Sequence, residues 1–230
     1  MENSSIFRQV VFFFCFFFSK VKSSVSNEMD EIDNVTESLQ NLNLVVPVSE
    51  RTPLMQRLLD GTATVEDVPE NVNVFYRENG WTPLMYAVKQ SNDEVATQIA
   101  DLSPESLNFR NPLDGKTALI YAIEENLPDI VEMLFITTTA DRISSMANYA
   151  NNMDFRKTPL MYALTIDDEE ACINMMGKLT ENLANIYAVN ENGQTVLQQA
   201  RQLEREGRIT SNLLTQLEGL LYRPENPQDG

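Results

Sequence analysis

The chain of 230 residues contains no histidine, one tryptophan and two cysteines. Without histidine it lacks the commonest general base near neutral pH and a frequent metal ligand. Cys15 and Cys172 stand far apart, so the sequence has neither a disulfide framework nor zinc-ligand spacing. We also find no nucleophile–base pair and no phosphate-binding loop. The sequence therefore predicts no catalytic residue, no metal site and no cofactor.

Basic side chains are also scarce, with 17 lysines and arginines against 34 acidic residues and a formal net charge of −17. Nearly all of the negative charge lies beyond residue 28. Because phosphate contacts need clustered Lys and Arg, this balance argues against nucleic acid as a partner. The charge either serves solubility or favours a protein partner with a basic segment.

No apolar run is long enough to span a bilayer as a helix. The longest, Val10–Phe18, has nine residues. It matches the length of a signal-peptide core, with small residues at 24–26 for cleavage, but it lacks a basic leader. We interpret 1–28 as an apolar and basic leader that is signal-like, or as a spurious extension before a start at Met29, or as an anchor or buried segment. The expected location is the cytoplasm, or a secreted or membrane-associated one if the leader is genuine.

What the chain does have is a recurring phrase. Thr-Pro-Leu-Met-Tyr-Ala begins at Thr82 and at Thr158, and Thr-Ala-Leu-Ile-Tyr-Ala begins at Thr117. Weaker copies begin at Thr52 and Thr195. Successive threonines lie 30, 35, 41 and 37 residues apart. A period in the thirties is typical of a solenoid, in which each repeat buries its apolar face against its neighbours.

Each copy has the same order of turn, capping and helix residues, which is clearest around Thr82. Gly80 supplies a turn residue that tolerates positive φ, Thr82 caps a helix, and Pro83 occupies its first position. Apolar residues at 84, 87 and 88 form one stripe of that helix. A second helix begins near Asp93 with acidic residues in its first turn, where the helix dipole favours them.

This order of turn, Gly, Thr-Pro-Leu, Ala and second helix resembles the ankyrin repeat, and residues 126–135 resemble that family's second helix. The resemblance covers about residues 51–222. It implies an all-α ankyrin-repeat solenoid of about five helix-turn-helix units, with the first and last acting as caps. We expect 29–50 to be a flexible acidic segment and 223–230 a disordered tail.

The sequence departs from the family pattern at several places. Met85, Ile120 and Met161 stand where the family usually has His, so apolar packing must replace polar ties between repeats. Arg156 replaces the turn glycine, which predicts a turn that is strained or differently built. An insertion around 137–152 predicts a longer second helix with a loop, and the first repeat has room for only a short second helix around 65–68.

The resemblance implies a non-enzymatic scaffold or adaptor that binds a protein partner through its turn tips and the concave face of its first helices. We expect a monomer. Trp81 and Phe155 are either anchors or are tucked against a neighbouring turn. Tyr86, Tyr121 and Tyr162 are expected to stack inside the array, and the alternative is that they form a binding stripe. Counting from each threonine gives the candidate partner-binding residues Tyr76, Glu78, Asn79, Trp81, Lys89, Asn111, Leu113, Asp114, Lys116, Asp154, Phe155, Lys157, Glu191 and Asn192.

Overall fold

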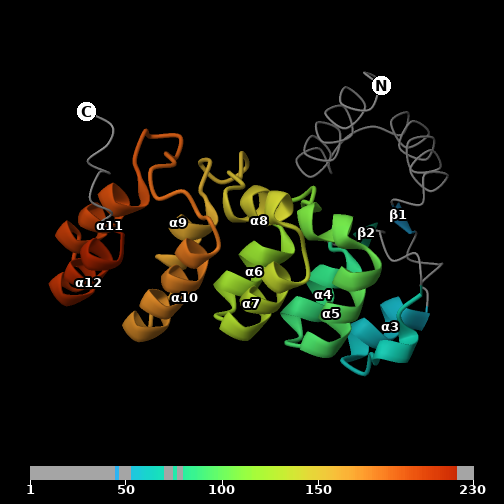
Figure 1. Cartoon of the computed structure of the whole chain (residues 1–230). Coiled ribbons are helices and arrows are strands. Elements are labelled where there is room, and N and C mark those ends of the chain that lie inside the picture. The colour runs from blue at the N-terminus through green and yellow to red at the C-terminus, as the bar shows by residue number, and fades with distance from the viewer. Residues whose placement is uncertain (1–44, 47–52, 70–74, 77–79, 222–230) are drawn as a thin grey trace, which may run out of the picture. The chain divides into compact units, whose positions relative to one another are not determined.

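The computed structural model describes residues 45–46, 53–69, 75–76 and 80–221 (Figure 1). Glu78 and Asn79, the tail 223–230 and the leader 1–28 lie outside the described residues. The described chain falls into two compact units, of which unit 1 ends at Thr117 and unit 2 begins at Ala118. Both are built from short helices that pack in consecutive pairs. The predicted all-α architecture of consecutive helix pairs is confirmed, and the phrases that begin at Thr82, Thr117, Thr158 and Thr195 lie at the starts of first helices.

Unit 1 contains two helix pairs and one short strand pairing. Within 29–50 the structure describes only Val45–Val46, which form a two-residue strand that pairs in parallel with Phe75–Tyr76. In chain order the elements are β1 (Val45–Val46), α3 (Pro53–Asp60), the 3-10 helix η2 (Val65–Asp67), β2 (Phe75–Tyr76), α4 (Pro83–Lys89), α5 (Asp93–Leu102) and the 3-10 helix η3 (Pro104–Asn108). The single 3-10 turn η2 confirms the short second helix expected for the first repeat.

Side-chain caps fix where the helices of unit 1 begin. The Thr82 hydroxyl accepts a hydrogen bond from the Met85 N–H at 3.3 Å, and Asn92 Oδ1 accepts one from the Val95 N–H at 3.1 Å. The other end of the Asn92 amide donates to the Ala63 carbonyl at 3.0 Å. One asparagine therefore caps α5 and ties it to the preceding repeat, which satisfies groups that a helix start otherwise leaves unpaired.

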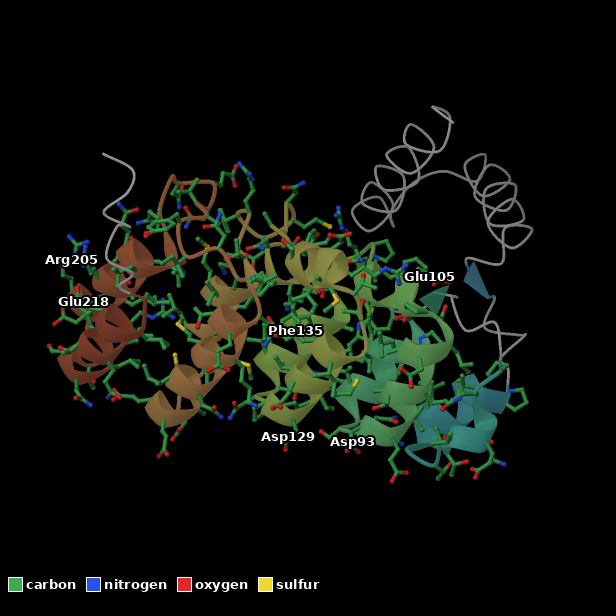
Figure 2. All side chains as sticks on the ribbon, viewed as in Figure 1. Asp93, Glu105, Asp129, Phe135, Arg205 and Glu218 are labelled. Carbon is green, nitrogen blue, oxygen red and sulfur yellow. The ribbon has the colours of Figure 1, made fainter. Side chains whose placement is uncertain are left out.

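Unit 2 continues the same pattern, with one extra helix. Its elements are α6 (Ala118–Glu124), α7 (Pro128–Ile136), α8 (Ala140–Ala147), α9 (Pro159–Ala163), α10 (Glu169–Glu181), α11 (Val196–Arg205) and α12 (Ser211–Leu221). Figure 2 shows Phe135 of α7 in the interior and Asp129 at the edge where α7 begins. On the last pair, Arg201 and Glu218 form an ion pair at 2.9 Å, which suits a terminal cap that faces water.

The insertion corrects one prediction. Instead of a longer second helix, α7 ends at Ile136 and the separate helix α8 begins at Ala140. Three consecutive threonines, 137–139, lie at the break. The Thr137 hydroxyl donates to the Met133 carbonyl at 3.1 Å, and Thr139 is extended. Because β-branched residues with hydroxyls that bond the backbone favour helix ends over helix interiors, the run interrupts the helix.

The recurring tyrosines and the residues that replace the family histidine are interior. Tyr86, Tyr121 and Tyr162 are 9%, 4% and 2% exposed, which confirms their predicted burial. Met85, Ile120 and Met161 are fully buried. The positions at which polar ties are absent are thus filled by apolar side chains, and each unit is held by packing there.

Candidate protein-binding surface

Three hairpin turns, at residues 111–116, 151–157 and 190–194, precede first helices. Each begins with a buried asparagine, namely Asn111, Asn151 or Asn190. In each turn the asparagine Oδ1 accepts a hydrogen bond from the N–H two residues later, at 2.9–3.0 Å. Each asparagine N–H also donates to the carbonyl that closes its turn, on Lys116, Lys157 and Gln194. The buried amides therefore set the turn shape from inside.

Counting back from the threonines found only one of these asparagines. A constant spacing places Asn152 and Val189 opposite Asn111, whereas the structure places Asn151 and Asn190 there. The turns close over different lengths, so a fixed offset slips by one residue. An asparagine just before every turn is the signal that could have found them. Asn111 is 2% exposed, and its side chain serves the turn rather than the surface.

The turns also need left-handed backbone. Gly80, Gly115 and Gly193 have φ of 68°, 73° and 72°. In the second hairpin turn Phe155 and Arg156 take this conformation at φ of 50° and 54°. A side chain in this region clashes with its own backbone. The expected strain at Arg156 is confirmed, and it extends to the residue before it.

In unit 1 the aromatic candidate is half-buried. The Trp81 ring packs edge-on against Tyr86, with centroids 4.9 Å apart at an interplanar angle of 62°. Lys89 is exposed, with its Nζ 6.0 Å from the centroid of the Trp81 ring. The structure therefore favours the tucked interpretation of Trp81.

Of the remaining candidates described in unit 1, three lie on the first hairpin turn and one lies on β2. Leu113 is 48% exposed at its turn tip. The Asp114 carboxylate accepts a hydrogen bond from the Lys116 N–H at 3.0 Å, and both residues are partly exposed. Tyr76 lies on β2. Unit 1 thus brings Leu113, Asp114 and Lys116 together on one turn.

In unit 2 the second hairpin turn holds a small polar network. The Lys157 ammonium pairs with Asp154 at 3.1 Å and lies 5.6 Å from the Tyr162 ring centroid. Asn151 Nδ2 donates to the Tyr162 hydroxyl oxygen at 2.9 Å. Burial raises the pKa of Tyr162 above its usual range, and the hydrogen bond with Asp154 raises it further. The Tyr162 hydroxyl therefore stays protonated. The charges of Asp154 and Lys157 are paired with each other.

Phe155 is more exposed than the other apolar candidates whose side chains the structure describes, Trp81 and Leu113. Its side chain is 60% exposed, and its carbonyl accepts a hydrogen bond from the Glu191 N–H at 2.8 Å. Glu191 and Asn192 are exposed on the third hairpin turn. Figure 1 shows the loops before α9 and before α11 on the same side of unit 2. The structure thus brings Phe155, Glu191 and Asn192 together.

Sequence reasoning missed two exposed apolar side chains. Leu183 and Tyr187, in the segment that leads to the third hairpin turn, are 58% and 63% exposed, and Val189 is 42% exposed. This segment is tied to the end of α8, where Asn148 Nδ2 donates to the Leu183 carbonyl at 3.0 Å. The same Asn148 accepts a hydrogen bond from the Asn185 N–H at 2.6 Å. No sequence pattern separates these exposed apolar residues from core residues.

Two further observations concern the described part of the chain. It contains no group of three or more His, Cys, Asp or Glu side chains arranged to hold a metal ion. Within the same residues, no helix has both the length and the apolar character needed to cross a bilayer.

Consecutive helix pairs, each preceded by a hairpin turn, define a helical repeat protein. The family model for ankyrin repeats, in three copies, matches residues 42–144. The same threonine-led helix pairs continue beyond residue 144 in α9–α10 and α11–α12. Residues 42–144 of this chain are therefore similar in sequence to ankyrin repeats. Ankyrin repeats typically form non-enzymatic modules that mediate protein–protein interactions.

Two of the solved structures that are similar to this chain are of ankyrin repeat proteins. The ankyrin repeat domain of Bcl-3, a unique member of the IkappaB protein family, is 18% identical over 72% of this chain and 61% of that one, with a TM-score of 0.47. The chain thus spans about three-fifths of that domain. EF0377, an ankyrin repeat protein, is 20% identical over 72% of this chain and 88% of its own, with a TM-score of 0.34.

A third similar chain occurs in the complex of the Bd0816 predatory endopeptidase from Bdellovibrio bacteriovorus with the immunity protein Bd3460. It is 20% identical over 70% of this chain and 90% of that chain, with a TM-score of 0.35. No curated protein matches the sequence.

Proposed function

We propose that this chain is a non-enzymatic scaffold or adaptor that binds a protein partner through its hairpin turns and the exposed faces of its first helices. The observation that carries the proposal is Phe155, a large apolar side chain that is 60% exposed at a turn tip. Aromatic side chains on exposed turns are frequent anchors of protein interfaces. Trp81 and Leu113 supply further apolar surface on unit 1.

The proposed partner carries a basic segment. The chain has a formal net charge of −17, and a field of one sign steers oppositely charged partners. Such steering acts mainly on the association rate, and it weakens as salt rises. We therefore expect slower capture of the partner at high ionic strength.

The test is affinity capture from the native cell with wild type beside the double variant Trp81→Ala/Phe155→Ala. A partner that is captured by wild type and lost by the folded double variant supports binding through the turns. The control is Ile136→Ala, because Ile136 is 76% exposed on α7 and belongs to none of the three hairpin turns. A partner retained by the double variant contradicts the proposal.

The proposed location is the cytoplasm, and the proposed state is a monomer. A secreted or membrane-associated protein that acts outside its own cytoplasm is the second candidate, favoured by the apolar run Val10–Phe18. Mass spectrometry of the mature N-terminus separates the two, since signal cleavage near 24–26 supports the second. Size-exclusion chromatography with light scattering tests the monomer.

A further inference from the structure

Two residues of unit 2 combine an unfavourable backbone conformation with an exposed apolar side chain. Among described residues other than glycine, positive φ occurs at Ser91, Asn126, Phe155, Arg156 and Leu183. Phe155 and Leu183 are the large apolar ones, and both are exposed, at 60% and 58%. A left-handed backbone conformation is unfavourable for such residues. An exposed apolar side chain also lacks the favourable free energy that burial would give it. Strained residues that persist at a surface are candidates for function.

Hydrogen bonds tie the Phe155 backbone to Glu191 and the Leu183 backbone to Asn148. Phe155 is joined through its carbonyl to Glu191, two residues beyond Val189, so the backbones at Phe155 and Val189 are separated by on the order of 10 Å. Leu183 is held through its carbonyl by Asn148, at the end of α8. We call the exposed apolar side chains Phe155, Leu183, Tyr187 and Val189 the loop surface.

Acidic side chains lie at both ends of the 183–189 segment. Glu181 precedes Leu183 at the end of α10, and Glu191 follows Val189 on the third hairpin turn; both are exposed. Within the described residues neither carboxylate has an ion pair, whereas Lys157 is paired with Asp154. Arg156 is the exposed cation on this side. Two unpaired carboxylates that flank apolar groups complement a ligand with cationic ends and an apolar centre.

We propose that the loop surface binds a short segment of a partner protein in which large apolar side chains are flanked by Lys or Arg. Phe155 and Tyr187 contact the apolar side chains, and Glu181 and Glu191 face the cations. This inference rests on the proposed function, since it assumes that the chain binds proteins. It adds a surface beyond the turn tips and a chemical class of ligand.

The experiment is a selection of short random peptides displayed on phage against the full chain, followed by binding measurements on the enriched peptides. The test variant is Leu183→Ser/Tyr187→Ser, which keeps both hairpin turns. The matched control is Leu102→Ser, because Leu102 is 41% exposed on α5 of unit 1. Circular dichroism and thermal unfolding establish that both variants are folded.

We expect enriched peptides that combine aromatic or aliphatic residues with Lys or Arg. Their affinity should fall about tenfold or more in the test variant and change less than about twofold in the control. Glu181→Gln/Glu191→Gln should weaken binding a few-fold at low salt and flatten its salt dependence.

Three results overturn the inference: no enrichment, enriched peptides without basic residues, or equal affinity for wild type and the test variant. Its failure can be told apart from failure of the proposed function. If the cellular partner is lost on Trp81→Ala/Phe155→Ala but retained by Leu183→Ser/Tyr187→Ser, the scaffold proposal stands and this inference fails. If the partner is retained by both variants, both proposals fail.

Discussion

Arg156 occupies the left-handed position that glycine occupies in other turns of this chain, and Asn151 compensates for it. The Asn151 carbonyl accepts hydrogen bonds from the Asp154 and Arg156 N–H groups at 3.1 and 2.9 Å. Its amide reaches the Tyr162 hydroxyl. A buried side chain that is hydrogen-bonded at both its amide nitrogen and its amide oxygen can hold a turn that the local residues disfavour.

Replacing Arg156 by glycine should therefore stabilise unit 2. Glycine removes the left-handed penalty of about 1–2 kcal/mol but loses more entropy on folding, so we expect a net gain of about 0.5–1 kcal/mol. The measurement is the urea midpoint of unfolding. Arg208→Gly is the control, because Arg208 is also exposed but has no positive φ, and it should destabilise. A lower midpoint for Arg156→Gly would contradict the argument.

Gly80 has a second requirement besides its φ of 68°. A Cβ there would lie 2.3 Å from Asn111 Oδ1 and 2.8 Å from Pro112 Cδ. Gly61 has a similar φ of 69°, but a Cβ there meets nothing within 4 Å. We expect Gly80→Ala to destabilise by about 2 kcal/mol or more and Gly61→Ala by about 1. Equal losses in thermal unfolding would show that the contact with Asn111 carries no energy.

At the scale of elements, the end of α8 is hydrogen-bonded to the segment that carries the loop surface. The residue that caps its C-terminal end, Asn148, makes two hydrogen bonds to that segment, to Leu183 and Asn185. Asn148 also donates to the Ser144 carbonyl within α8 at 2.9 Å. The insertion in this repeat thus braces the loop after α10.

Asn148→Ala should loosen this segment without unfolding unit 2. Losing two hydrogen bonds to an exposed loop costs about 1–2 kcal/mol locally. Hydrogen exchange should speed up at residues 182–190 and stay unchanged in α6 and α7. Asn152→Ala, an exposed asparagine with no hydrogen bond of its side chain in the described structure, is the control. Uniform acceleration across unit 2 would show that α8 is part of the core instead.

Helix α10 buries the thiol of Cys172, and burial raises its pKa to about 11, with Glu169 adding to the shift. The unfolded chain, with a thiol pKa of 9.0, therefore loses this proton first as pH rises. Stability from this group is complete below pH 9 and falls as pH rises toward 11, by up to about 2 kcal/mol. Cys172→Ala should show a shallower decline in urea unfolding between these pH values, and parallel curves would refute the assignment.

For the whole molecule, the governing quantity is the net charge of −17. Self-repulsion of like charges opposes the compact state, and salt screens it. Raising NaCl from about 10 to about 150 mM should stabilise the protein by about 1 kcal/mol. The gain should shrink in Asp101→Asn/Asp167→Asn/Glu181→Gln, which removes three exposed carboxylates. A salt response that is flat in wild type would mean that the charges are already balanced locally.

The repeat, the starts of the helices and their buried faces could be predicted from the amino-acid sequence alone. Thr82 caps α4, Pro128 opens α7, and the recurring tyrosines are interior, because capping, proline geometry and 3.6-residue periodicity act within a few residues. Even the strain at Arg156 could be predicted from a missing glycine.

Three features could not be predicted from the sequence: which asparagines hold the turns, where α8 begins within the insertion, and the exposure of Leu183 and Tyr187. These features depend on contacts between segments far apart in the chain, such as Asn148 with Asn185 and Phe155 with Glu191. The turns also differ in length, so equivalent residues fall at unequal offsets. Local propensity does not predict such contacts. The exposure of a side chain depends on which segments pack against it and not on its residue type alone.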